Sequence, residues 1–434
     1  MFRSSAADKR KDWILSYKPG TYLDHADREV NYDDFVYKEL VLYSIANCAR
    51  AIPSVVDGLK PGQRKILFAC FKRNLTKEIR VAQLSGYVSE VAAYHHGEVS
   101  LQSAIVGMAQ NYVGSNNINL LQPQGQFGTR LEGGKDAASA RYIHTFLAPL
   151  ARLVFSALDD EIIDYEQEDG LAIEPKWYMP IVPFVLMNGN KGIGTGWSSN
   201  IPNFNPRDVI AQLRRLMTNE PLETIHPWYR GFQGRIEWMP KPQQYKVSGV
   251  WARTSETTIK VTELPVSTWT QAFKVTLDAF LEEKEGGKAA LVTDYDDHST
   301  ECRVDFEITI PTLPQLSDAE VEKQLGLTST MTVSNMHFFD HKGHIHKYDD
   351  VNSIIRDFYH LRLAFYGKRK DFLIGQIQAE YKKLSNQMRF ILAVINKELN
   401  ISNRKKKDII SELVAMNFDR FPPKRTRKGD VRFF

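Results

Sequence analysis

The sequence has few cysteines and no long apolar run. Cys48, Cys70 and Cys302 are isolated thiols without CxxC spacing, which excludes a disulfide framework and a cysteine zinc cage. No stretch of about 18 apolar residues occurs, and the first residues lack the apolar core of a secretory signal. We therefore expect no membrane partner and a reducing compartment, either the cytosol or the nucleus.

A strong excess of one charge and a nucleotide-binding loop are also missing. Lysine and arginine together number 56 against 52 acidic residues, and the net charge of +4 is too small to identify a polyanion-binding protein. No GxxxxGK[ST] loop occurs, and the glycine run near Gly192 has Trp197 where a GxGxxG loop needs its third glycine. The chain therefore shows no nucleotide site of its own. Basic residues form short clusters, each of which a solvated surface would also explain: Lys9–Lys11, Lys60–Lys65, Lys368–Lys370, Arg404–Lys407 and Lys424–Lys428.

What the sequence does have is a globular composition, with 43% hydrophobic and 25% charged residues over a length of 434. Residues 1–31 are polar and contain a Pro-Gly turn signal, so we expect a linker with little structure of its own. Residues 32–180 have helical periodicity, and residues 181–350 change to short β-rich runs. Residues 351–434 begin with a long helical pattern. The predicted fold is multidomain and α+β.

Local patterns refine three of these segments. Pro61 suits the first turn of a helix, and with further helices over 80–94 and 98–112 it predicts a helix-turn-helix or winged-helix domain. Strands are expected at 245–251 and 257–261, in a domain that a charged loop at 282–288 interrupts.

Two further expectations concern the acidic run 159–169 and the end of the chain. The acidic run matches no metal motif and is expected to be a solvated surface loop. Apolar residues recur at helical spacing from Val351 to Leu399 without proline, which favours a projecting or coiled-coil helix. After Asn403 the sequence becomes basic, and we expect no closing helix to pair with the long one.

Three groups of residues could perform chemistry. The first places Lys60, Arg64 and Lys65 around the predicted start of a helix, where free N–H groups and the helix dipole favour phosphate. The second is His95-His96 at a turn between two helices. Neighbouring histidines are poor joint metal ligands on a helix, but in a loop both can donate to phosphate oxygens. A capping or packing role for the pair would explain the sequence equally well.

The third group surrounds Tyr142. The glycines between 125 and 134 let backbone approach a ligand, Arg130 and Lys135 supply positive charge, and Arg141 adjoins the phenol. A phenol with a pKa near 10 is a weak nucleophile until cations favour its phenolate, a role open to Arg141. Taken alone, a tyrosine such as Tyr142 is far more often a hydrogen-bonded structural residue.

Five motifs in order resemble one family. They are the segments Asp57–Lys65, Tyr94–Glu98, Gln124–Arg130, Ala140–Tyr142 and Gly192–Trp197. With them the chain resembles the breakage-reunion region of the eukaryotic type IIA DNA topoisomerases, from about residue 20 to residue 415. The resemblance implies a winged-helix domain with the catalytic tyrosine, a tower-like α+β domain and the first arm of a coiled coil that lacks the C-terminal gate.

The resemblance also implies roles for individual residues. Tyr142 would attack a DNA phosphodiester and form a 5′-phosphotyrosine link, with Arg141 and His96 stabilising charge on the phosphate. Arg50, Lys60, Arg64 and His95 would hold nearby DNA backbone, and Ile193 would be an apolar wedge that unstacks a base step and bends the duplex.

The family's cofactors imply parts that these residues do not contain. Its Mg²⁺ is held by an acidic TOPRIM cluster and its ATP by a separate ATPase domain, so no metal ligand is expected here. The implied protein is an ATP-hydrolysing type II topoisomerase that acts as a homodimer on double-stranded DNA in the nucleus. We expect this chain to be inactive without the TOPRIM and ATPase parts, as a fragment or a split subunit. The runs 404–407 and 423–428 resemble import signals. A DNA-binding and DNA-bending module without enzymatic activity stays the alternative.

Overall fold

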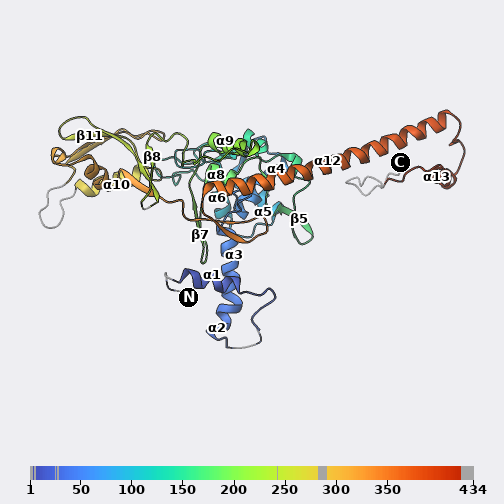
Figure 1. Cartoon of the computed structure of the whole chain (residues 1–434), viewed down its shortest axis with the longest axis horizontal. Coiled ribbons are helices and arrows are strands. Elements are labelled where there is room, and N and C mark those ends of the chain that lie inside the picture. Colours follow the sequence, from blue (N-terminus) through green and yellow to red (C-terminus); the bar gives the residue numbers. More distant parts are fainter. Residues whose placement is uncertain are drawn as a thin grey trace. The chain divides into compact units, whose positions relative to one another are not determined.

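The computed structural model describes the chain except residues 1, 2, 4, 5, 25, 27, 28, 242, 282–290 and 422–434. The chain divides into two compact units, and the boundary between Arg362 and Leu363 falls within helix α12 (Val351–Ile395; Figure 1). The expected charged loop at 282–288 and the basic run at 423–428 lie outside the described residues.

The N-terminal segment contains a helix that sequence patterns did not indicate. Helix α1 (Ala7–Leu15) buries Trp13, and Ile14 packs against a cluster of Cys48, Ile52 and Trp197. The expectation of little structure before residue 32 is wrong for this helix, because two apolar side chains are enough to attach a short polar helix to a neighbour. A helical stretch follows, formed by α2 (Tyr32–Asp34), a π-helix η1 (Phe35–Leu40) and α3 (Val41–Ala51).

Four helices and a small antiparallel sheet form the next part of the first unit. Helix α4 starts at Pro61, where a missing N–H costs nothing, and ends at Asn74 in the left-handed conformation. The sheet has the strand order β1-β3-β2. Apolar faces of the helices pack together through fully buried side chains that include Ile66, Leu67, Leu84, Leu101 and Ile105. The elements are α4 (Pro61–Arg73), β1 (Ile79–Arg80), α5 (Val81–Ala92), α6 (Glu98–Ala109), β2 (Leu121–Gln124), β3 (His144–Leu147) and α7 (Pro149–Val154).

The acidic segment after α7 is ordered. It contains the 3-10 turn η2 (Ala157–Asp159) and a hairpin of β4 (Tyr165–Glu168) and β5 (Leu171–Pro175). Asp159 is 2% exposed and accepts a hydrogen bond from Arg362 Nη1 at 2.7 Å. The expectation of a solvated loop over 159–169 is therefore wrong for Asp159, because this carboxylate is needed inside to neutralise a distant arginine, whereas most of the other carboxylates of the segment are exposed.

A second hairpin and two helices complete this region. Helix α8 (Phe184–Asn188) leads into β6 (Asn190–Ile193), which pairs with β7 (Ser198–Ile201), and α9 (Pro206–Met217) follows. Further on, β15 (Met336–Phe339) and β16 (Ile345–Tyr348) form a hairpin. Phe339 exchanges backbone hydrogen bonds with Pro53 and Val55, so this hairpin is fixed to the segment just before α4.

The β-rich region has two sheets, as expected for an α+β protein. One has the order β14-β9-β8 and the other β10-β11-β13-β12, and all neighbouring strands are antiparallel. Strands expected at 245–251 and 257–261 are present as β9, β10 and β11. The elements are β8 (Arg235–Met239), β9 (Gln244–Ser248), β10 (Val250–Arg253), β11 (Thr258–Glu263), α10 (Thr270–Leu281), β12 (Asp294–Asp297), β13 (Phe306–Thr309), η3 (Leu313–Gln315), α11 (Asp318–Gln324) and β14 (Thr328–Met331).

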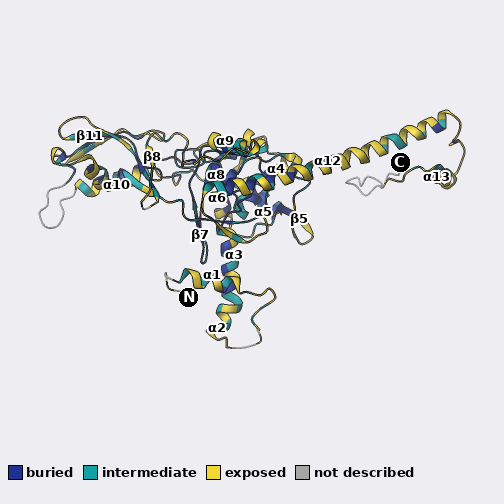
Figure 2. Cartoon of the chain, viewed as in Figure 1, coloured by how far each residue is buried: buried dark blue, intermediate teal, exposed yellow. Residues whose placement is uncertain are grey.

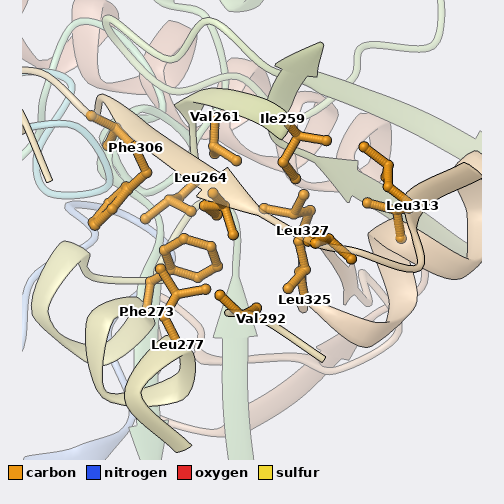
Figure 3. Close-up of a cluster of buried hydrophobic side chains, with 14 residues drawn as sticks. Ile259, Val261, Leu264, Phe273, Leu277, Val292, Phe306, Leu313, Leu325 and Leu327 are labelled. Carbon is orange, nitrogen blue, oxygen red and sulfur yellow. The ribbon is translucent and has the colours of Figure 1, made fainter. Parts of the chain in front are cut away.

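A cluster of buried side chains fills the space between α10 and the four-stranded sheet (Figure 3). Leu277 of α10 is 0% exposed in this cluster, whereas Val275 on the same helix is 59% exposed.

Leu277→Ala is expected to lower the free energy of unfolding by about 2–5 kcal/mol, because it leaves a cavity that the sheet cannot close. Val275→Ala is expected to change it by less than about 0.5 kcal/mol. Urea titration followed by tryptophan fluorescence measures both, and equal losses would contradict this core.

The second unit contains the rest of α12 and a shorter helix, α13 (Lys406–Ala415). Figure 2 shows α12 with many exposed positions along its length. After α13 the chain returns along α12, where Arg389 Nη2 donates to the Met416 carbonyl at 3.0 Å and Phe390 contacts Phe418. The long helix is confirmed. The basic stretch also contains a helix that the sequence did not indicate, α13, although the contacts described here with α12 come from the residues that follow it. A ten-residue helix has too few periodic positions to stand out in a basic, polar stretch.

Candidate nucleic-acid interface

The start of α4 carries a lysine that is held against another loop. The Gln63 side chain accepts a hydrogen bond from the Lys60 N–H at 3.0 Å, and Lys60 Nζ donates to the Lys191 carbonyl at 2.7 Å. Burial lowers the pKa of the Lys60 ammonium. The cation therefore joins α4 to the β6–β7 hairpin, next to the first, unpaired N–H groups of the helix.

Three of the predicted DNA contacts lie in internal ion pairs. Arg64 is 6% exposed, with Nε 2.7 Å from Asp57 Oδ2, and Lys65 Nζ lies 2.9 Å from Glu174 Oε2. Arg130, also 6% exposed, pairs with Glu263 at the end of β11. The structure does not bring these three cations onto an open surface. Their charge stabilises the packing of α4, β5 and the β-rich region.

The loop between α5 and α6 presents the histidine pair. Ala93 and Gly97, both with positive φ, turn the chain out of one helix and into the next, which leaves His95 and His96 exposed. His95 Nε2 lies 2.8 Å from Glu168 Oε1. The His96 ring meets Tyr94 edge to face with centroids 5.6 Å apart.

Tyr94 brings three predicted segments together. A Cβ at Gly62 would lie 3.9 Å from its ring, which places the phenol beside the start of α4. Burial raises the pKa of Tyr94, and the nearby Arg50 charge opposes that rise. Arg50 at the end of α3, the first turn of α4 and the His96 ring thus surround one phenol. Sequence reasoning assigned no role to this residue, although it adjoins both histidines.

Tyr142 projects from a turn that is fixed on both sides. Its side chain is 67% exposed, while the neighbouring Ala140 and Ile143 are buried. The first two N–H groups of α5, those of Val81 and Ala82, donate to the carbonyls of Ile143 and Ala140 at 3.0 and 3.1 Å. The Arg141 guanidinium lies over the Tyr142 ring, 4.9 Å from its centroid. The phenol therefore has a defined position and an open approach.

Tyr142 and the histidines lie at opposite ends of α5. The turn of Tyr142 is bound to the first residues of this helix, and His95 follows its last residue by three positions. With 12 residues in α5, the two ends are about 18 Å apart at 1.5 Å per residue. Within one chain, Tyr142 and the histidines are therefore held at opposite ends of one helix.

The glycine-rich loop before Tyr142 closes on itself. Asp136 accepts hydrogen bonds from the Thr129 N–H and hydroxyl at 2.8 and 2.6 Å. A Cβ at Gly128, whose φ is +90°, would lie 2.5 Å from the Gly134 backbone. The glycines thus permit a tight loop fold, and the close approach of their backbone to a ligand stays a prediction. Lys135 lies exposed on this loop.

The β6–β7 hairpin presents an isoleucine to solvent. Ile193 at the end of β6 is 75% exposed. A Cβ at Gly192 would collide with the Ala51 carbonyl oxygen, and one at Gly194 would lie 3.1 Å from Cys48 Sγ. The hairpin therefore lies directly on α3 and holds Ile193 outward. A cavity of about 500 Å³ adjoins its base, lined by residues that include Lys60, Gln63, Gln110, Asn188 and Lys191.

Two further properties bear on ligands and on location. In the part of the chain that the structure describes, one group of side chains lies close enough together to hold a metal ion, in the four-stranded sheet. Asp296 lies on β12, His298 in the turn after β12 and Glu307 on β13. No described helix is both long enough and apolar enough to cross a membrane.

Comparisons with known proteins agree with this architecture. Residues 50–423 match the family described as the A subunit of DNA gyrase/topoisomerase IV, and residues 1–48 match the C-terminal associated domain of TOPRIM. The second match covers the segment that was expected to be a linker.

The chain is similar to named relatives over nearly its whole length. It is 49% identical to DNA topoisomerase 2 of Arabidopsis thaliana and 46% identical to human DNA topoisomerase 2-alpha, over 98% and 99% of its length. It spans 29% of each of those proteins. A crystal structure of the Plasmodium falciparum topoisomerase II DNA-binding, cleavage and re-ligation domain superposes with a TM-score of 0.86 at 44% identity, over 96% of this chain and 57% of that one.

Proposed function

Because the chain belongs to the DNA gyrase/topoisomerase IV A-subunit family, we propose that it is the DNA-cleaving segment of a type II DNA topoisomerase. The observation that carries the proposal is Tyr142, a 67% exposed phenol on a turn fixed by the start of α5. Attack on a phosphodiester needs a hydroxyl that the phosphate can reach and that is held in one place, and this turn provides both.

In the proposed reaction the Tyr142 oxygen attacks a DNA phosphorus and the bond from phosphorus to the 3′ oxygen breaks. The phenol proton leaves Tyr142 and the 3′ oxygen ends as a hydroxyl, so the products are a 5′-phosphotyrosine and a free 3′-OH. One phosphodiester replaces another, which is why rejoining the strand needs no ATP. Arg141, which adjoins the phenol, is proposed to stabilise the charge on the phosphate.

Burial divides the basic residues predicted to contact DNA into two groups. Arg50, Lys135, His95 and His96 are exposed, and Lys60 lies at a helix start, so these side chains are proposed to hold phosphates. Arg64, Lys65 and Arg130 are proposed instead to support the surface from inside, since their carboxylate partners already occupy them.

Two copies of the chain are needed to complete the proposed site. Tyr142 and His96 lie at opposite ends of α5, a helix that is about 18 Å long. A phosphate that contacts both would therefore have Tyr142 from one copy and His96 from the other. This supports the proposal that the protein acts as a homodimer on double-stranded DNA, with one cut in each strand.

The proposed domains of this chain are those that the resemblance to the family implies. Helices α4 to α6 with the sheet β1-β3-β2 are proposed to form the winged-helix domain, and the two β-rich sheets the tower. The part of α12 beyond Leu363 is proposed to begin a coiled coil. The chain spans 29% of the length of these two relatives, so ATP hydrolysis and the TOPRIM site are proposed to lie in parts outside it. The proposed place of action is the nucleus.

The residues around Tyr142 do not fit a Mg²⁺ site. Its described neighbours include a cation, Arg141, and the one metal-compatible group of described residues lies on β12 and β13 in another sheet. The carboxylates for Mg²⁺ are therefore proposed to come from a TOPRIM part, and the steps proposed for this chain use its own residues alone.

A complementation assay tests the proposal. The chain is mixed with a TOPRIM-bearing partner, Mg²⁺ and supercoiled plasmid, and detergent is added to trap the products. Protein-linked linear DNA is the expected result. DNA binding without any linkage would sink the proposed enzymatic function and favour the alternative, a DNA-bending module.

The exposed isoleucine belongs to both the proposed function and the alternative, and it makes its own prediction. Ile193→Ala is expected to lower the population of bent duplex by about tenfold or more, since inserting its apolar side chain between bases contributes roughly 1.5–3 kcal/mol. Energy transfer between dyes at the two ends of a duplex measures the bend. Leu171, which is 71% exposed, lies on the β4–β5 hairpin. Leu171→Ala is the matched control and should leave the bend unchanged. Unaltered bending by Ile193→Ala would remove the wedge from the mechanism.

A further inference from the structure

The tip of the β4–β5 hairpin engages one of the proposed DNA-binding histidines. His95 Nε2 and Glu168 Oε1 are 2.8 Å apart, and their side chains are 70% and 40% exposed. The two residues come from elements 73 positions apart in sequence, so the fold and not local chain geometry brings them together. The contact occupies the ring nitrogen of a side chain that lies open to solvent.

Glu168 is held in this position by the structure of its hairpin. Asp169 and Gly170 form a tight turn with φ angles of 49° and 76°, which joins the two strands directly after Glu168. At the other end of the hairpin, the buried Glu174 pairs with Lys65 of α4. Tyr165 also contacts Phe68 of α4, with ring centroids 6.2 Å apart. The glutamate is thus presented from a fixed support.

The hairpin is also strongly acidic. Between Arg152 and Lys176 the sequence contains no lysine or arginine. Exposed carboxylates lie on the hairpin, at Glu166 and Asp169, and just before it, at Glu161 and Asp164. A DNA backbone that approaches His95 therefore meets negative charge at the same place, and this charge repels phosphate.

We propose that Glu168 competes with a DNA phosphate for His95, so that the hairpin holds this histidine until duplex DNA displaces the carboxylate. The inference rests on the proposed function, which assigns His95 to the DNA backbone. Carboxylate and phosphate oxygens are both acceptors for an imidazole N–H, so one can replace the other at Nε2. An exposed pair of this kind contributes at most about 1 kcal/mol, and DNA can therefore displace it at a cost of up to about fivefold in affinity.

Duplex binding by the chain tests the competition. Fluorescence anisotropy of a labelled duplex gives the affinity of the wild type, Glu168→Ala, Glu166→Ala and His95→Ala. Glu166 lies two residues away on the same strand, so its variant changes the net charge equally without touching the histidine contact. We expect Glu168→Ala to bind DNA about two- to fivefold more tightly and Glu166→Ala to gain clearly less.

The double variant separates competition from general repulsion. In a His95→Ala background the gain from Glu168→Ala is expected to shrink to that of Glu166→Ala. Equal gains from the two glutamate variants, or a full gain without His95, would overturn the competition while leaving the proposed function standing. If the wild-type chain binds no duplex at all, the proposed function fails and the competition fails with it.

Discussion

Tyr142→Phe is expected to abolish covalent attachment to DNA while duplex affinity stays within about twofold of the wild type. The phenol oxygen is the proposed nucleophile, and phenylalanine removes that atom alone. The ring that lies under the Arg141 guanidinium is retained, and the 67% exposed side chain makes no core contact whose loss would unfold the turn. Binding and chemistry should therefore separate cleanly in this variant.

The measurement is protein-linked DNA after detergent, in the presence of a TOPRIM-bearing partner and Mg²⁺. We expect a loss of at least about a thousandfold, which places the signal below detection. Tyr43→Phe, at a 60% exposed tyrosine of α3, is the matched control and should keep full linkage. Linkage that persists in Tyr142→Phe would move the nucleophile to another residue.

Asp57→Ala is expected to lower the free energy of unfolding by about 3–5 kcal/mol. Asp57 is 0% exposed and accepts hydrogen bonds from Arg64 Nε and from the N–H groups of Leu59 and Tyr178. Without the carboxylate, the Arg64 guanidinium stays buried without its ion-pair partner. The loop before α4 loses its anchor at the same time.

Thermal or urea unfolding followed by circular dichroism measures this loss. Glu220→Ala removes one partner of an exposed ion pair with Arg215 and is expected to cost less than about 1 kcal/mol. Similar losses in the two variants would show that the Asp57–Arg64 pair is no more important than a surface contact. DNA affinity of Asp57→Ala is expected to fall as well, because Lys60 follows directly after the anchored loop.

Sequence patterns predicted the features that depend on neighbouring residues. Pro61 marks the first turn of α4, and the apolar period from Val351 predicts α12. The register of the Gly192 run argues against a nucleotide loop, although it did not predict the β6–β7 hairpin that the structure has there. Each of these is decided by local backbone preference or by a repeat. The exposed position of Tyr142 could not be read from the sequence, since it depends on α5 holding the turn from both sides.

The roles of the cations depend on partners far away in the sequence. Lys65 meets Glu174, 109 positions later, and Arg130 meets Glu263, 133 positions later. Only the folded chain decides which basic side chains are neutralised inside and which stay at the surface. For the same reason the sequence singled out Lys65 and Arg130 as DNA contacts and overlooked Tyr94, whose neighbours come from three segments.

Helix α5 has a consequence for how this protein can change over evolutionary time. Its first residues hold the turn of Tyr142 and its last residues lead into the histidine loop. Inserting or deleting one residue within the helix would shift one end relative to the other by about 1.5 Å and rotate it by about 100°. Exposed positions of α5 can therefore accept many different amino acids, whereas the number of residues between its ends is constrained. Length variation in this region belongs in loops that do not connect the two reactive groups.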